Sequence, residues 1–189
     1  SVFPLAQCKD AFRLMAQGRH VGKLVITLPT QAAPCRIRAD GTYLIVGAFG
    51  GLGLRLQRWL VEQGARALLL VGRQLPQPDS DAEQQLQTLR AQGIDAEALT
   101  WVDLPQSLDV LPNHQPLRGV IHAAGTLWDQ RIDAIDEVGL EKVMSVKWGV
   151  GQQLQQVQKQ RPEAWLKLDF NLVFSSLAAG VGSPGQLVY

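Results

Sequence analysis

Two hydroxyl side chains near the end of the sequence are of the types that could protonate and hold a carbonyl oxygen during its reduction. Ser176 follows an apolar run, and Tyr189 lies beyond the glycine-rich stretch LAAGVGSPGQ. A tyrosine whose pKa is lowered by a nearby cation can protonate a carbonyl oxygen as hydride reaches the carbon. A serine hydroxyl beside it would hold that oxygen. From spacing alone, a loop serine and a packing tyrosine explain these residues equally well.

A glycine-rich turn, VGAFGGLG at 46–53, could bind the phosphates of a dinucleotide. Glycines at 47, 51 and 53 would give a tight turn, a bare backbone for a pyrophosphate and close helix–strand packing. A following helix would offer free N–H groups and its positive dipole end. Glycine is common in plain turns, but this stretch lies between an apolar run and an amphipathic segment. That position favours nucleotide binding.

Arg73 follows the next apolar run, in the sequence Val71-Gly72-Arg73. Dinucleotide sites that prefer NAD carry an acid at this place to bind the ribose hydroxyls. A guanidinium instead matches a 2′-phosphate, which favours NADPH. The alternative is an arginine that merely faces solvent at a strand end.

Apolar runs that alternate with amphipathic segments predict the elements that position these residues. We expect strands at 42–47, 67–72, 96–102, 118–125 and 170–176, and helices at 52–62, 81–92 and about 140–157. In the first helix, Leu52, Leu56, Trp59 and Leu60 are expected to face inward. The glutamines of 152–160 are expected to form a solvated helix face. The alternation predicts an α/β fold with a doubly wound parallel sheet.

The N-terminal region has a different pattern of apolar and polar residues. Apolar residues recur at helical spacing within residues 5–15, and the short run KLVITL at 23–28 predicts a strand. Residues 29–41 carry two prolines and mixed polar residues, which is typical of a linker. We therefore predict a domain boundary at 29–41.

Composition excludes several classes of protein. The 18 Lys+Arg and 17 Asp+Glu residues leave a net charge of +1, which argues against a nucleic-acid-binding surface. No apolar run is long enough to cross a membrane, and the N-terminus lacks the pattern of a secretory signal. Cys8 and Cys35 form neither a disulfide framework nor a metal site. These features predict a globular protein of the cytoplasm.

From Thr42 to Tyr189 the sequence resembles the ketoreductase domain of type I polyketide synthases, a branch of the short-chain dehydrogenase/reductase family. The resemblance rests on TYLIVGAFGGLGL, RGVIHAAGTLWD and FSSLAAGVGSPGQLVY, which occur in that order. It implies a Rossmann-like fold and NADPH-dependent reduction of a β-ketoacyl thioester to the β-hydroxyacyl thioester. The substrate would arrive on the phosphopantetheine arm of an acyl carrier protein, within a polyketide or fatty-acid-like synthase.

The resemblance also implies roles for individual residues. Tyr189 would be the proton donor, Ser176 would hold the substrate carbonyl, and Lys147 in SVKWGVGQQL would match the catalytic lysine. His122 is expected to be a packed side chain rather than an acid or base. The residues implied in cofactor binding are Gly47, Phe49, Gly50, Gly51, Leu52, Gly53, Arg73, Asp103 (near the adenine), and Ala123, Ala124 and Gly125 (under the nicotinamide ribose).

Two further features bear on stereochemistry. Leu127-Trp128-Asp129 resembles the Leu-x-Asp signature of the subgroup that sets a D-configured alcohol, although Trp128 replaces an acid often found there. The opposite subgroup has a tryptophan eight residues before the tyrosine, where this chain has Val181. The resemblance therefore favours the D-alcohol.

The sequence departs from the family pattern in its loop and at its end. Val46 and Ala48 stand where the family usually has threonine and glycine. Ala48 would add a methyl group near the phosphates, and either change could weaken cofactor binding. The family also has an asparagine four residues after the tyrosine, then further helices and strands. We therefore expect a fold truncated at its C-terminal end, belonging to a longer polypeptide.

Residues 1–28 resemble the closing helix and strand of a polyketide synthase enoylreductase, the domain that precedes the catalytic ketoreductase in fully reducing modules. The resemblance implies neighbouring enoylreductase and dehydratase domains and a homodimer of the whole synthase. Two alternatives remain open. One is an inactive ketoreductase-like domain that supports the enoylreductase, and the other is a module that senses the cofactor.

Overall fold

The computed structural model describes residues 1–27, 36–103, 115–160 and 162–176. The chain divides into two compact units, Ser1–Cys35 and Arg36–Tyr189, and the division lies within the segment predicted as a linker. Tyr189 and Val181 lie outside the described residues. Within the described part of the chain, no helix combines the length and apolar character needed to span a membrane.

The first unit contains a short parallel pair of strands and one helix. β1 (Val2–Pro4) pairs with β2 (Val25–Thr27), and α1 (Cys8–Ala16) lies between them in sequence after a 3₁₀ turn. The predicted helix and strand are present. β1 was not predicted, because three residues ending in proline are too short to show an alternating pattern.

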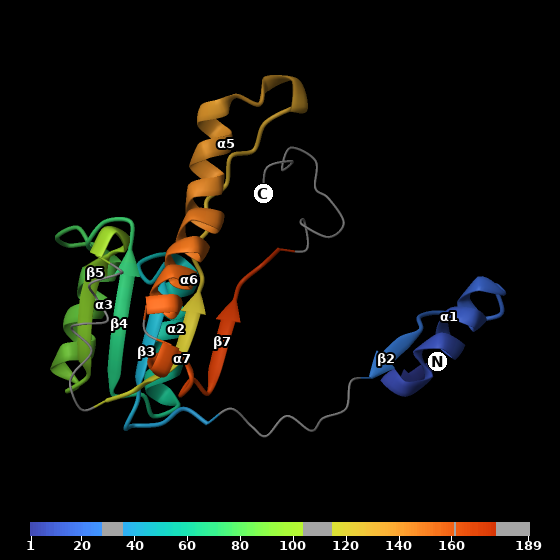
Figure 1. Ribbon diagram of the computed structural model, residues 1–189, viewed down its shortest axis with the longest axis horizontal. Helices are drawn as coiled ribbons and strands as arrows, with labels where there is room; N and C mark the ends of the chain where they lie inside the picture. The colour runs from blue at the N-terminus through green and yellow to red at the C-terminus, as the bar shows by residue number, and fades with distance from the viewer. Residues whose placement is uncertain (28–35, 104–114, 161, 177–189) are drawn as a thin grey trace. The chain divides into compact units, whose positions relative to one another are not determined.

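The second unit is built on a five-stranded sheet whose pairs are all parallel (Figure 1). The strand order is β5-β4-β3-β6-β7, so the strand that leads into the glycine-rich turn is at the centre. The bounds are β3 (Thr42–Val46), β4 (Ala67–Gly72), β5 (Asp95–Thr100), β6 (Leu117–His122) and β7 (Phe170–Val173). The predicted strand at 96–102 ends earlier because Trp101–Asp103 forms a 3₁₀ turn.

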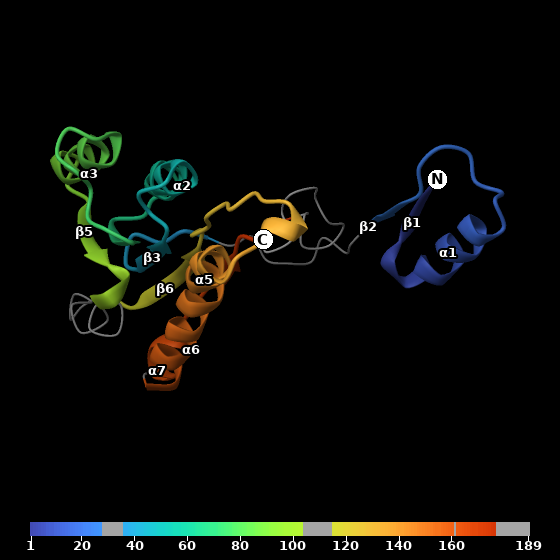
Figure 2. The ribbon, with the colours of Figure 1, turned by 90° about the horizontal axis from the view of Figure 1, so that it is seen from above.

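Helices cover both faces of this sheet (Figure 2). α2 (Gly51–Glu62) and α3 (Asp81–Ala91) lie on one face, and α6 (Val150–Gln160) and α7 (Pro162–Trp165) lie on the other. α5 (Glu137–Met144) extends beyond the carboxyl ends of the strands (Figure 1). The central strand is buried on both sides, so its residues alternate between the two cores. Tyr43 and Ile45 pack with Leu60 of α2, while Leu44 and Val46 pack with Val150 of α6. The predicted doubly wound α/β fold is confirmed.

The inward face of α2 agrees only in part with the predicted one. Leu52 and Trp59 are more than 40% exposed, whereas Gly53, Gln57 and Leu60 are buried. Gln57 can be buried because its Nε2 donates to the Ala48 carbonyl at 2.8 Å. Leu56 and Leu60 face the core as predicted, but apolar spacing alone missed Gly53 and Gln57, because one is a glycine and the other carries an amide.

The helix predicted at about 140–157 is present, and it contains a π-helical segment that was not predicted. A π-helical turn, Ser145–Gly149, separates α5 from α6. The glutamines of α6 are mostly exposed, and Val157 faces the core, in agreement with the predicted solvated face. Single-turn π segments of this kind occur often at functional sites.

Part of the predicted linker folds with the second unit. The Tyr43 hydroxyl accepts a hydrogen bond from the backbone N–H of Arg38 at 2.6 Å, and Ile37 packs against the core. This part of the predicted linker is therefore fixed to the sheet at the amino end of β3.

The packing of α2 on the loop before it gives a stability prediction. A Cβ at Gly53 would lie 2.3 Å from the carbonyl oxygens of both Gly47 and Ala48, whereas a Cβ at Gly51 would meet nothing within 4 Å. Gly53→Ala should therefore lower the free energy of unfolding by about 1–3 kcal/mol, because backbone atoms must move. Gly51→Ala, the matched control, should change it by less than about 1 kcal/mol. Equal effects in denaturant unfolding would contradict this packing.

Candidate functional site

A cleft of about 420 Å³ opens at the carboxyl ends of β3, β4 and β6. Ligands bind at this end of open α/β sheets, where neighbouring connections diverge to opposite faces. The walls come from the glycine-rich turn, the segment after β4 and the segment after β6. The lining residues include Val46, Gly47, Phe49, Gly50, Arg73, Trp101, Ala123, Ala124, Gly125 and Thr126.

The glycine-rich turn is held closely against the segment after β6. Gly47 has φ +85°, and a Cβ there would lie 2.5 Å from the Ala124 nitrogen. The Gly47 N–H donates to the Val71 carbonyl at 2.8 Å, and the Ala123 N–H donates to the Val46 carbonyl at 2.8 Å. Only glycine combines this backbone conformation with so close an approach.

The N-terminus of α2 is suited to an anion. Its N-cap is Gly50, which offers no side chain, and its first turn within the described chain holds no acidic residue. By contrast, Ser80 caps α3 by accepting from the Glu83 N–H, and Asp136 caps α5 by accepting from the Gly139 N–H. The first amides of α2 and its positive dipole end therefore remain for a ligand at the mouth of the cleft.

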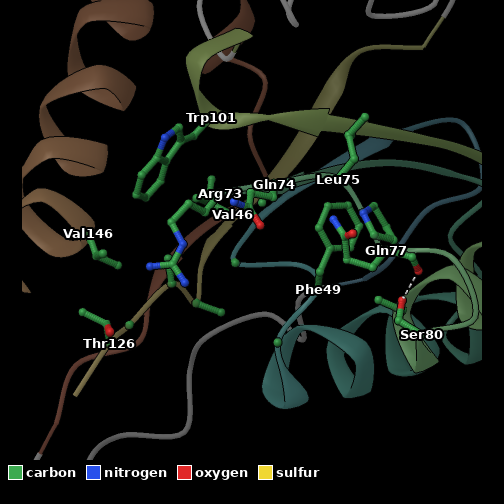
Figure 3. A pocket seen from close by; sticks show the side chains of 18 residues that line it. Val46, Phe49, Arg73, Gln74, Leu75, Gln77, Ser80, Trp101, Thr126 and Val146 are labelled. Carbon is green, nitrogen blue, oxygen red and sulfur yellow. Dashed lines mark hydrogen bonds between the residues drawn. The ribbon is translucent and has the colours of Figure 1, made fainter. Parts of the chain in front are cut away.

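Arg73 projects into the same cleft from the end of β4. Figure 3 shows its guanidinium reaching toward Val146 and Thr126, with the indole of Trp101 nearby. Phe49 and Leu75 line the other part of the cleft in this view. The predicted cation therefore faces the cavity, and Trp101 adds an apolar wall that the sequence analysis did not single out.

Not every predicted cofactor residue lines this cleft. Gly51 and Leu52 lie in the first turn of α2 beside it, and Gly53 packs under the loop. Asp103 also lies outside the lining, and its carboxylate accepts a hydrogen bond from the Thr100 hydroxyl. Trp101, two residues earlier, lines the cleft in its place.

The two departures in the loop have different structural consequences. The Ala48 side chain is fully buried in the core formed with α2 and α3, so its methyl group does not extend into the cleft. This corrects the expectation that the methyl stands near the phosphates. Val46 does line the cleft, although its side chain is also packed in the opposite core.

A second cleft, of about 590 Å³, lies between β7, the end of β6 and the helices α6 and α7. Lys147 and Ser176, two of the predicted catalytic residues, both line it. Its apolar walls include Trp148, Trp165 and Phe174. The π-helical turn separates the two clefts, because Val146 lines the first and Lys147 lines the second.

Lys147 is held toward the end of β7. Its Nζ donates to the Phe174 carbonyl at 2.9 Å, two residues before Ser176. Partial burial lowers the pKa of Lys147 below its usual range. The structure thus brings Lys147 and Ser176 to one cleft, while the third predicted catalytic residue, Tyr189, lies outside the described residues.

His122, predicted as a packed side chain, is buried and also lines the second cleft. Its Nε2 lies 3.4 Å from the Lys147 carbonyl. The strand predicted at 118–125 includes His122, but no spacing rule connected this residue with a lysine 25 residues later.

Trp128 of the predicted stereochemical signature lies against α5. Its indole is close to Gly139, and the Lys142 ammonium stands over its ring at 4.1 Å from the centroid. This contact fixes the segment after β6 to the N-terminal turn of α5. It does not test the stereochemical prediction.

Within the described residues, no group of three or more histidine, cysteine, aspartate or glutamate side chains could hold a metal ion.

Most of the chain matches one known protein family. The family described as KR domain matches residues 41–189 of this chain. The chain belongs to the KR domain family. The predicted resemblance to ketoreductase domains of type I polyketide synthases is thereby confirmed, and with it membership of a family of reductases. The match begins at residue 41, so the identity of the first unit stays a prediction.

Two synthases illustrate the relationship. The chain is 40% identical over 200 residues to "Erythronolide synthase EryA2" of Saccharopolyspora erythraea, covering all of this chain and 5% of that protein. It is 33% identical over 202 residues to "Mycocerosic acid synthase-like polyketide synthase" of Mycobacterium tuberculosis, covering 99% of this chain and 9% of that protein. The chain therefore spans less than a tenth of the length of these relatives.

Solved structures agree with the sequence relatives. A structure titled "Structure of A-type Ketoreductases from Modular Polyketide Synthase" matches with a TM-score of 0.70 and 29% identity, over 85% of this KR chain and 34% of that one. A gluconate 5-dehydrogenase from Burkholderia cenocepacia, in complex with NADP and tartrate, matches with a TM-score of 0.66 and 20% identity. It covers 82% of this chain and 61% of that one, and supports the Rossmann-like fold alone.

The burial of His122 predicts how stability changes with pH. Burial, with the nearby Lys147 charge, lowers the pKa of His122 below its usual 6.5, although the Lys147 carbonyl partly opposes this. As the pH falls below 6.5, the His122 imidazole takes up a proton in the unfolded chain before it does so in the folded KR domain. The free energy of unfolding should therefore fall by up to about 1.4 kcal/mol for each pH unit below 6.5, until the folded pKa is reached.

His122→Gln is the matched variant, because its side-chain amide replaces the imidazole N–H as a hydrogen-bond donor but does not titrate. Urea unfolding between pH 7.5 and about 5 should show a smaller loss of stability in this variant than in the unmodified protein. Parallel curves for the two proteins would show that His122 does not contribute to the pH dependence.

Proposed function

We propose that this chain reduces a β-ketoacyl thioester to the β-hydroxyacyl thioester with NADPH, as part of a multidomain polyketide or fatty-acid-like synthase. The observation that carries the proposal is the convergence of Lys147 and Ser176 on one cleft, beside the cleft of the glycine-rich turn. Both lie at the carboxyl end of the sheet, where an α/β reductase binds its ligands.

The donors around the first cleft fit a phosphorylated dinucleotide. The uncapped N-terminus of α2 suits a pyrophosphate, Arg73 suits a 2′-phosphate, and Trp101 offers an apolar wall for an aromatic base. A nicotinamide dinucleotide bound there would supply the hydride. Ala123, Ala124 and Gly125 would pass beneath its ribose, as the family resemblance implies.

The chain's own residues would manage the carbonyl oxygen. The Ser176 hydroxyl would donate a hydrogen bond to that oxygen, and Tyr189 would give it a proton as hydride adds to the carbon. The Lys147 ammonium would favour ionisation of the tyrosine and bind the cofactor ribose. One hydride and one proton thus convert the ketone to the alcohol, for which we expect the D configuration.

The second cleft suits the acyl part of such a substrate. Trp148, Trp165 and Phe174 would contact an apolar chain, while its carbonyl faces Ser176 and Lys147. The thioester would be presented by the phosphopantetheine arm of an acyl carrier protein. We expect enoylreductase and dehydratase domains as neighbours, with residues 1–28 as the end of an enoylreductase. We also expect a homodimer of the whole synthase in the cytoplasm.

The role of Tyr189 as proton donor can be tested by substitution. In the intact protein, Tyr189→Phe should lower kcat for NADPH-dependent reduction of a soluble β-ketoacyl thioester by about 10²- to 10⁴-fold, because the general acid is lost. Tyr43→Phe also removes a phenolic hydroxyl, but from the start of β3, where this hydroxyl accepts a hydrogen bond from the Arg38 backbone N–H. This control should leave kcat essentially unchanged.

A folded protein that neither turns over nor binds NADPH would contradict the reductase and support the scaffold alternative. Full activity of Tyr189→Phe would instead retain the reductase and overturn the assigned proton donor.

The choice between the two nicotinamide cofactors can be tested at Arg73. Arg73→Ala should raise the Kd for NADPH by about 10- to 100-fold, because a charge-assisted hydrogen bond to the 2′-phosphate is lost. The Kd for NADH should change little. Arg55→Ala removes the same charge from an exposed position on α2 outside the cleft, and should leave both values close to those of the unmodified protein. An equal loss for NADPH and NADH would contradict the phosphate-binding role.

A further inference from the structure

Three residues on three different elements are linked into a closed set of hydrogen bonds beside the second cleft. His122 ends β6, Lys147 lies in the π-helical turn, and Phe174 follows β7. The Phe174 N–H donates to the His122 carbonyl at 2.9 Å, and the Lys147 ammonium donates to the Phe174 carbonyl at 2.9 Å. The His122 ring closes the set, because its Nε2 lies 3.4 Å from the Lys147 carbonyl.

The partner of the His122 ring fixes its tautomer. A backbone carbonyl only accepts, so Nε2 must carry the proton that makes this contact. His122 is 3% exposed, and among the described residues its buried Nδ1 has no hydrogen-bond partner. A second proton on Nδ1 would therefore place an unpaired N–H in the interior, near the Lys147 ammonium. The ring is suited to a neutral donor rather than to proton transfer.

The contact reaches the lysine through its backbone rather than through its side chain. The π-helical turn changes the helical register around Lys147, so the orientation of this residue depends on what holds the turn. On one side, Val146 packs in the core with α6, and on the other side His122 meets the Lys147 carbonyl from the end of β6. The side chain then reaches across to Phe174, two residues before Ser176.

We infer that His122 is a positioning residue, which holds the π-helical turn to the sheet so that the Lys147 ammonium stays at the Phe174 carbonyl beside Ser176. This inference rests on the proposed function, because it assumes that Lys147 takes part in the reduction. His122 itself needs no contact with substrate or cofactor. Its action is to fix the lysine relative to the end of β7.

The test compares three substitutions of His122 in the intact protein. His122→Leu removes the donor, His122→Asn keeps a polar group too short to reach the Lys147 carbonyl, and His122→Gln restores a donor near the position of Nε2. Leu and Asn should lower kcat by about 10- to 100-fold, because small displacements of a catalytic group have effects of this size. Gln should recover most of the activity, and KM for the thioester should change less than kcat in all three.

A second readout does not depend on activity. The side-chain amine of Lys147 can be followed by NMR in protein labelled with ¹³C-lysine, and Lys147→Met assigns its signal. Burial lowers the pKa of Lys147 in the structure, so release of the side chain from the cleft should raise this pKa toward its usual 10.5 in His122→Leu and His122→Asn. It should stay low in His122→Gln. If the Leu variant fails to fold, the Asn and Gln pair gives the same comparison.

The outcomes separate this inference from the proposed function. Loss of activity in Lys147→Met with unchanged kcat and unchanged lysine pKa in the folded Leu or Asn variant would overturn the positioning role while leaving the reductase intact. Full activity of Lys147→Met would overturn the role of the lysine in the reaction itself. Equal losses in the Asn and Gln variants, with the lysine pKa unmoved, would show that His122 serves stability alone.

Discussion

The close crossing of two backbone segments at the end of the sheet shapes the first cleft, and with it the place where a cofactor would bind. Gly47, at the end of β3, passes so near Ala124, after β6, that a side chain on Gly47 would collide with that backbone. The strands on either side are already fixed by parallel pairing, so the crossing sets where the turn into α2 begins and where the chain leaves β6. Widening this crossing would separate the N-terminus of α2 from the segment that faces it across the first cleft.

Burial and charge are arranged differently in the two clefts. The first offers backbone amides and an exposed arginine, which suit a highly charged ligand that brings its own negative groups. The second surrounds one partly buried ammonium with aromatic side chains, and a neutral histidine supports the turn that carries it. A cation with a lowered pKa in an apolar setting interacts more strongly with a nearby oxygen or phenol than it would in water.

The sequence was sufficient for those parts of the fold that depend on continuous apolar runs. β3 and β4 were predicted nearly residue for residue, because strands buried on both faces show no competing pattern. The inward side of α2 was predicted only in part, and Gln57 was missed because its amide donates to the Ala48 carbonyl, a contact that no local pattern reveals. The π-helical turn and the contact between His122 and Lys147 were missed for a similar reason, since both depend on residues brought together from separate elements. Lys147 and Arg73 were identified only by combining the residue type with its place in a known family pattern or next to a predicted strand.

The π-helical turn contributes neighbouring residues to two cavities. Val146 lines one cleft and Lys147 lines the other, so a ligand cannot displace this turn from one side without altering the second side. By thermodynamic linkage, any factor by which a ligand in the first cleft changes the affinity of the second cleft equals the factor by which a ligand in the second changes the affinity of the first. A short backbone segment shared in this way gives the two clefts a common wall, so a substitution that reshapes the turn alters both of them.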